Sequence, residues 1–92
     1  MDLKKESNRI YLEDEEGKLL AEINFEKIDE NNFNIYHTFV DESLRGQGIA
    51  SKLVEEAVKE IKKQGGNVQA TCSYAKKWLD ANLGWNQKYF SI

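Results

Sequence analysis

The chain has 92 residues, a formal net charge of −3 and a pI near 5.2. This length suits one domain spanning 1–92, and 40% hydrophobic residues can fill one small core, which argues against disorder. The acidic balance argues against nucleic acid as the main partner, and no apolar stretch is long enough for a membrane span. A single cysteine cannot form an internal disulfide, which is typical of a reducing compartment, so we expect a cytoplasmic protein. From the charge and the lack of a long apolar stretch, we expect neither a nucleic-acid nor a membrane partner.

Three strands are predicted in the first forty residues, at Arg9–Glu13, 19–26 and 33–40. In the third strand we expect one face to carry Phe33, Ile35, His37 and Phe39, and the other to carry Asn34, Tyr36, Thr38 and Val40. The turns at 14–17 and 29–32 are rich in acidic residues, which are either solvated or attract a basic acceptor. Short turns between successive strands predict an antiparallel meander.

An amphipathic helix is predicted from Ile49 to about Lys63. Its apolar stripe is Ile49, Leu53, Val54, Ala57, Val58 and Ile61. Its solvated face is Lys52, Glu55, Glu56, Lys59, Glu60, Lys62 and Lys63. Gly65-Gly66 ends this helix, and a strand follows at 67–72.

A second helix is predicted to begin with Ser73 as its N-cap, with Ala75, Trp78 and Leu79 facing inward. Trp85 is also expected in the core, and the segment 85–92 forms an edge strand or packs on the domain. The predicted fold class is α+β (α/β), in the order β-β-β-α-β-α. The helix between strands three and four makes those strands parallel, with a right-handed crossover.

The turn Arg45-Gly46-Gln47-Gly48-Ile49-Ala50 joins the third strand to the long helix. Backbone N–H groups at the start of a helix have no intrahelical partner, and the helix dipole favours an anion there, so this turn can seat a phosphate group. No Lys-Ser/Thr follows the glycines, which excludes a P-loop. A dinucleotide fingerprint is also excluded, because its third glycine and distal acidic residue are missing. The alternative is that the glycines serve only the geometry of the turn and that no phosphate binds there.

The spacing R-x-x-G-x-A resembles the acyl-CoA loop of the Gcn5-related N-acetyltransferases, and the resemblance runs from about Ile10 to Leu83. It implies acetyl-CoA as cosubstrate. The implied residues for the pantetheine arm are Phe39 and Val40. Those for the pyrophosphate are Arg45, Gly46, Gln47, Gly48, Ile49 and Ala50. Lys77, together with Lys76, is expected near the 3′-phosphate. For Arg45, a solvated loop arginine is the alternative, and for Lys76 and Lys77 the alternative is that they are only exposed to solvent. In longer members, helices ahead of the sheet help to build the acceptor pocket.

Within that superfamily, the chain looks most like a compact subgroup with two short motifs. His37-Thr38-Phe39-Val40 matches H-T-x-V, and Cys72-Ser73-Tyr74-Ala75 matches C-S-[YF]-[AV]. The resemblance implies Cys72 and His37 as catalytic residues, with Tyr74 as a proton donor to the departing thiolate. The alternatives are a small buried cysteine, a core histidine and a packing tyrosine.

Three functions remain open from the sequence. The first is an N-acetyltransferase that acts on an unidentified amine, either by direct attack of the amine on acetyl-CoA or through an acyl-Cys72 intermediate. Alternatively, the chain is a module that binds acyl-CoA without turnover, or a small interaction domain whose glycine loop is only a turn. We expect a monomer or weak homodimer without a metal site.

Overall fold

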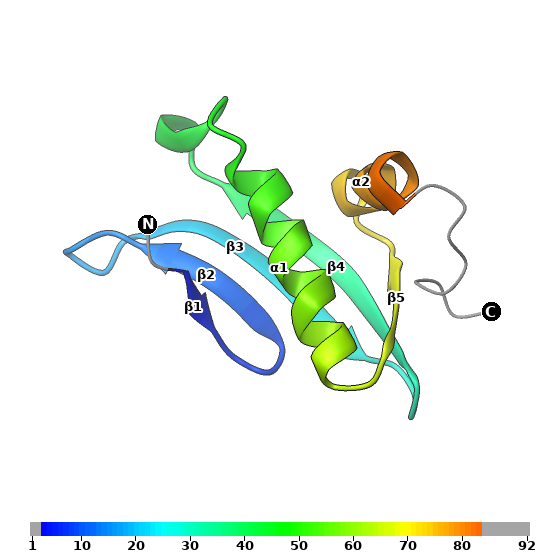
Figure 1. Cartoon of the computed structure of the whole chain (residues 1–92). Coiled ribbons are helices and arrows are strands. Elements are labelled where there is room, and N and C mark those ends of the chain that lie inside the picture. Colours follow the sequence, from blue (N-terminus) through cyan, green and yellow to red (C-terminus); the bar gives the residue numbers. More distant parts are fainter. Residues whose placement is uncertain (1–2, 84–92) are drawn as a thin grey trace.

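The computed structural model describes residues 3–83 (Figure 1). The elements are β1 (Lys4–Lys5), β2 (Arg9–Glu13), β3 (Leu19–Lys27), β4 (Asn32–Val40), the 3₁₀ helix η1 (Glu42–Leu44), α1 (Ile49–Lys63), β5 (Asn67–Ala70) and α2 (Ser73–Leu83). The predicted order β-β-β-α-β-α is confirmed, with β1 and η1 as additions. The predictions for Trp85 and for 85–92 lie outside the described residues.

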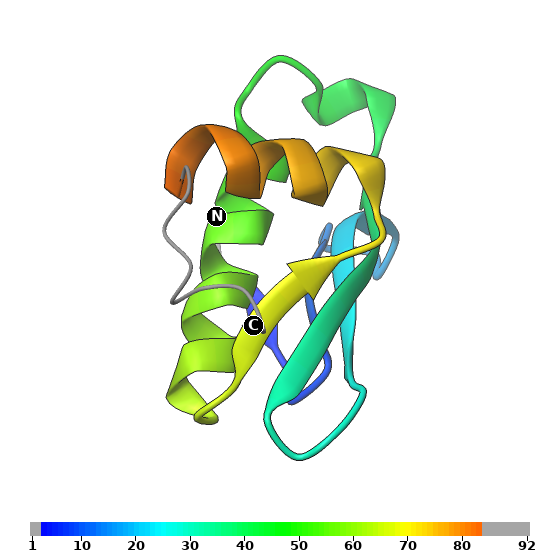
Figure 2. The same ribbon diagram turned by 90° about the vertical axis from the view of Figure 1, so that its right-hand side faces the viewer.

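The five strands form one sheet in the order β1-β2-β3-β4-β5. Neighbouring strands are antiparallel except β4 and β5, which are parallel, as the crossover through α1 predicts. Both helices lie on the same side of the sheet, and within the described chain its other face carries no helix (Figure 2). The core therefore lies between the sheet and the helices. Its residues include Ile10, Ile23, Phe25, Ile35, Leu53, Ile61, Val68 and Leu79.

The end of α1 is fixed closely against the start of β4. The N–H groups of Gly65 and Gly66 donate to the carbonyls of Lys62 and Ile61, which closes the last turn. A Cβ at Gly66 would lie 2.3 Å from the Phe33 ring, so only glycine fits there. This contact fixes where the crossover returns to the sheet.

Glu56 corrects one prediction for α1. It was expected on the solvated face, but it is 7% exposed. Its carboxylate is 2.6 Å from Lys5 Nζ, 3.2 Å from Lys52 Nζ and 3.4 Å from Lys59 Nζ. These bonds hold the pKa of Glu56 at about 2; the bond from Lys5 contributes most, and burial opposes the shift. Glu56 thus fastens β1 to the helix.

A bulge in β4 corrects the predicted alternation of its side chains. Asn24 pairs with His37 and Phe25 with Ile35, so Tyr36 is an extra residue with no partner on β3. Up to Ile35 the prediction holds, with Phe33 and Ile35 buried. Beyond the bulge the phase reverses: His37 and Phe39 are exposed, whereas Thr38 and Val40 are partly buried.

Candidate active site

The glycine loop begins from a capped turn. The Asp41 carboxylate accepts from the Ser43 N–H at 3.1 Å and from Ser43 Oγ at 2.6 Å, and these bonds lower the pKa of Asp41. This cap starts η1, which leads to Arg45. Gly48 then adopts a φ of +76°, a left-handed conformation that residues with a side chain rarely adopt, and it is the N-cap of α1.

The start of α1 is free of competing groups. Gly48 has no side chain with which to cap the helix, and the first turn of α1 contains no acidic residue. The N–H groups of Ile49, Ala50 and Ser51 are the first three of the helix and so lack intrahelical acceptors. Acidic side chains usually stabilise this end of a helix, so their absence leaves the positive end of the dipole to an external anion.

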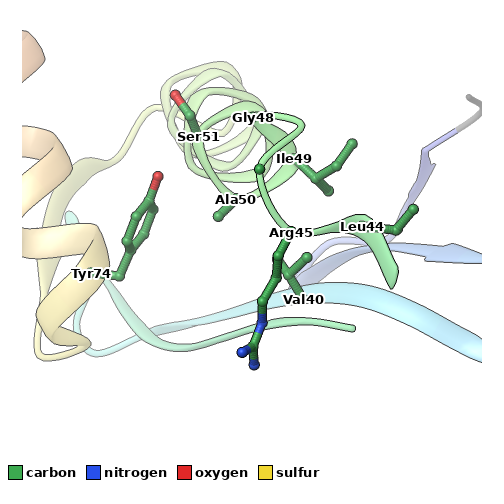
Figure 3. Close-up of a pocket in the computed structure, with 9 residues that line it drawn as sticks. Val40, Leu44, Arg45, Gly48, Ile49, Ala50, Ser51 and Tyr74 are labelled. Atoms are coloured by element: carbon green, nitrogen blue, oxygen red, sulfur yellow. The ribbon is translucent and has the colours of Figure 1, made fainter. Parts of the chain in front are cut away.

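A pocket of about 210 Å³ opens beside this loop (Figure 3). It is lined by Val40, Leu44, Arg45, Gly46, Gly48, Ile49, Ala50, Ser51 and Tyr74. Figure 3 shows Tyr74 of α2 on one side and the loop on the other, with the Ala50 side chain between them. The structure therefore brings seven of the sequence-predicted residues to one pocket. Sequence reasoning missed Leu44 and Ser51, whose only signal was their position next to the motif.

Ser51 also fixes the position of α2. Trp78 Nε1 donates to Ser51 Oγ at 2.7 Å, which ties the second helix to the first turn of α1. Trp78 was predicted in the core, and it is half-buried against it with this polar contact at the edge. The pocket thus lies between α1 and α2, which are joined to each other by this hydrogen bond.

The strands β4 and β5 separate next to this pocket. Their register pairs end at Ile35 and Ala70. The Ile35 carbonyl accepts from two N–H groups, those of Thr71 at 3.0 Å and Cys72 at 3.2 Å, and α2 begins directly afterwards. Because β5 no longer pairs with this part of β4, the segment from His37 to Val40 pairs in register with β3 alone.

Cys72 lies where the strands separate. Its carbonyl accepts from the Lys76 N–H at 2.9 Å, so Cys72 is the N-cap of α2, one residue before the predicted Ser73. The Cys72 Sγ is half-buried and 3.4 Å from Thr38 Oγ1. Burial alone would raise the pKa of the thiol, but the hydroxyl of Thr38 and the N–H groups of Ala75, Tyr74 and Thr38 together lower it below 9.0.

The other predicted residues lie around this point. His37 is exposed and, with Phe39, faces away from the helices. The prediction that His37 lies on the same face as Ile35 is therefore wrong. Tyr74 is 41% exposed in the first turn of α2. Among the described side chains, the one that hydrogen-bonds the Cys72 sulfur is Thr38, which no prediction had singled out. Gln47 and Lys77 are exposed and do not line the pocket.

An antiparallel sheet, continued through a glycine loop into a parallel βαβ unit, is the arrangement of the N-acetyltransferase fold. A family model described as GCN5-related N-acetyl-transferase matches residues 9–88. A GCN5-like candidate N-acetyltransferase from Staphylococcus aureus is 33% identical, with 99% of this chain and 89% of that chain covered and a TM-score of 0.77. The chain therefore belongs to the GCN5-related N-acetyltransferase family and is, by class, an acetyltransferase.

Longer proteins share the fold over part of their length. A candidate phosphinothricin N-acetyltransferase is 25% identical, with 84% of this chain and 53% of that chain covered and a TM-score of 0.60. An acetyltransferase from Bacillus cereus is 24% identical, with 75% and 54% covered and a TM-score of 0.62. This chain thus spans about half of these longer proteins. A search of curated protein sequences finds no significant match.

Neither helix within residues 3–83 is long and apolar enough to cross a membrane.

Proposed function

We propose that this protein is an acetyl-CoA-dependent N-acetyltransferase that carries the acetyl group on Cys72. The observation that supports this most directly is the position of the Cys72 thiol. It lies at the separation of β4 and β5, and Thr38 beside it is two residues from Val40 of the pocket. Two residues of a strand span about 7 Å. The glycine loop and the nucleophile are therefore close together along one strand.

The loop would hold the pyrophosphate of CoA. The free N–H groups from Gln47 to Ala50 and the dipole of α1 favour an anion there, and Arg45 and Lys77 would add positive charge. The pantetheine arm would follow β4 past Val40, taking backbone hydrogen bonds as an added strand does. This path leads the thioester toward Thr38 and Cys72.

The chemistry would consist of two exchanges. The Cys72 thiolate attacks the thioester carbonyl carbon; a bond forms between Sγ and the acetyl carbon, and the bond to the CoA sulfur breaks. Cys72 reacts as the thiolate after its proton has passed to water, and Tyr74 at the pocket donates its own proton to the departing CoA sulfur and regains one from water. An acceptor amine, deprotonated by His37, then attacks the acetyl-cysteine: a bond forms between nitrogen and the acetyl carbon, the bond to Sγ breaks, and the proton taken by His37 is returned to the Cys72 thiolate through water. Because His37 faces away from the helices and the sulfur lies beside Thr38, the amine would enter from the uncovered face and reach the acetyl group through the opening between β4 and β5.

The acceptor is an amine on a small molecule or a protein, and the protein acts in the cytoplasm as a monomer or weak homodimer. A module that binds acyl-CoA without turnover is a second candidate.

Intact-mass spectrometry after incubation with acetyl-CoA tests the proposal. We expect one acetyl adduct that hydroxylamine removes and that Cys72→Ala lacks. Adding a panel of amines should discharge the adduct and release free CoA thiol at the same rate. Cys72→Ser with full activity would refute the acyl-cysteine route and leave direct attack by the amine. An adduct that no amine discharges would favour the binding module.

A further inference from the structure

We propose that Thr38 is a positioning residue for Cys72: it holds the sulfur at the opening between β4 and β5 and donates its hydroxyl hydrogen to the thiolate. This inference rests on the proposed function, in which that thiolate takes the acetyl group. It assigns to Thr38 a role distinct from that of its neighbour His37.

The bulge at Tyr36 brings Thr38 to the sulfur. With regular alternation, the side chain of Thr38 would lie on the face opposite to Ile35. The extra residue reverses the phase, so that Thr38 is partly buried on the helix side and its Oγ1 lies 3.4 Å from Cys72 Sγ. A single inserted residue in β4 thus converts a threonine of the outer face into a neighbour of the nucleophile.

The remaining atoms of Cys72 are fixed by its main chain. Its N–H donates to the Ile35 carbonyl, and its carbonyl accepts from the Lys76 N–H. The N–H groups of Ala75 and Tyr74 in the first turn of α2, and that of Thr38, also lower the pKa of the thiol. Among the described side chains, the one that hydrogen-bonds the sulfur is that of Thr38.

A hydroxyl suits both states of the sulfur. In the thiol form, the S–H donates to Thr38 Oγ1. In the thiolate form, the hydroxyl rotates and donates to the sulfur, a charge-assisted bond that is stronger than a neutral one. When the thiolate attacks the thioester and becomes a neutral acetyl thioester, that bond weakens. Thr38 therefore favours the thiolate before the transfer and not the acetylated product.

The chain offers a matched control. Thr38 and Thr71 are its two threonines. Thr71 is one residue before Cys72, and its hydroxyl accepts from Asn34 Nδ2 at 3.0 Å. Thr38→Val and Thr71→Val therefore remove the same hydroxyl from positions near Cys72, but only Thr38→Val removes a contact of the sulfur.

The experiment measures the rate of Cys72 alkylation by iodoacetamide as a function of pH, without acetyl-CoA. In Thr38→Val we expect the midpoint to move to higher pH and the rate at neutral pH to fall about threefold to tenfold. Thr38→Ser should restore the parent profile, and Thr71→Val should keep it. If Thr38→Val does not fold by circular dichroism, Thr38→Ala replaces it. An unchanged profile without the hydroxyl, or an equal change in Thr71→Val, would overturn the proposal.

A second measurement separates this proposal from the function on which it rests. The acetyl adduct formed from acetyl-CoA should appear more slowly in Thr38→Val by the same factor as alkylation, while CoA affinity stays within twofold of the parent. An alkylation profile that responds to Thr38, in a parent protein that never forms the adduct, would refute the acyl-cysteine function and support the positioning role. A normal adduct rate in Thr38→Val would refute the positioning role and leave the function standing.

Discussion

The two halves of β4 have different roles, although they are consecutive in sequence. From Asn32 to Ile35 the strand is paired on both sides, with β3 and with β5, and its apolar side chains are buried. From His37 to Val40 it pairs in register with β3 alone, and its side chains are exposed or half-buried. The bulge at Tyr36 is the boundary. The first half holds the fold together, and the second has one backbone edge that β5 does not cover, with Thr38 bonded to Cys72 and His37 exposed.

The largest effect that tests this contrast is on stability. Ile35→Ala removes a fully buried side chain and should lower the free energy of unfolding by about 2–5 kcal/mol. Val40→Ala, in the half-buried second part, should cost about 1 kcal/mol or less, because less apolar area is lost. Urea unfolding of the two variants measures both values. Equal costs would show that the two halves do not differ in structural role.

His37→Gln tests the second half on activity. Because His37 is exposed, we expect stability within about 0.5 kcal/mol of the parent. Acetyl transfer should fall roughly 10²-fold if the imidazole acts as general base. CoA affinity should be unchanged, as judged by titration. An unfolded variant would instead give His37 a structural role, and full activity would remove it from the mechanism.

A comparison of Gly48→Val with Gly17→Val tests whether the glycine loop binds the pyrophosphate of CoA. Both glycines have positive φ, +76° and +85°, and a Cβ at either position meets no atom within 4 Å, so the backbone strain is matched. Only Gly48 lies where a phosphate would approach the backbone. Acetyl-CoA affinity should fall at least about tenfold in Gly48→Val, the equivalent of one lost charge-assisted hydrogen bond. Equal affinities in the two variants would place the pyrophosphate elsewhere.

The smallest expected effect is a pH dependence remote from the site. The folded pKa of Glu56 is about 2 against an ordinary 4.5, so its ion pairs stabilise the fold above pH 4.5, and this stability is lost as pH falls toward 2. We expect a loss of about 1–2 kcal/mol, reduced by the exposure of the lysine partners. Glu56→Gln should flatten stability curves between pH 5 and pH 2 relative to the parent. An unchanged curve would mean that Glu56 does not fasten β1.

Sequence reasoning predicted the order of elements and the loop because both depend on local signals. Periodicity identified the stripe of α1, and the glycines marked its start and end. The face assignment of His37 and Thr38 failed because a bulge is set by pairing with β3, and nothing in the sequence of β4 alone marks Tyr36 as the extra residue. Burial of Glu56 was missed for a similar reason: its first partner, Lys5, comes from a strand of two residues that gives no periodic signal.

The candidate site was predictable as a set of residues but not as contacts. Seven of the predicted residues line one pocket, since the motif is continuous along the chain. The contact between Cys72 and Thr38 joins residues 34 positions apart and depends on the bulge. A motif can point to Cys72 as a candidate nucleophile, whereas its neighbour Thr38 is found only once the three-dimensional arrangement of β4 and the start of α2 is known.

The strand β1 has a consequence for aggregation. In the described part of the chain it forms one edge of the sheet, and edge strands offer unpaired backbone groups to other chains. Here the edge is two residues long, and both residues are exposed lysines. Lys4 is held by Glu13 at 3.0 Å and Lys5 by Glu56 at 2.6 Å. A second copy that tried to extend the sheet here would meet fixed positive charge over a very short template, which protects this edge from self-association in a crowded cell.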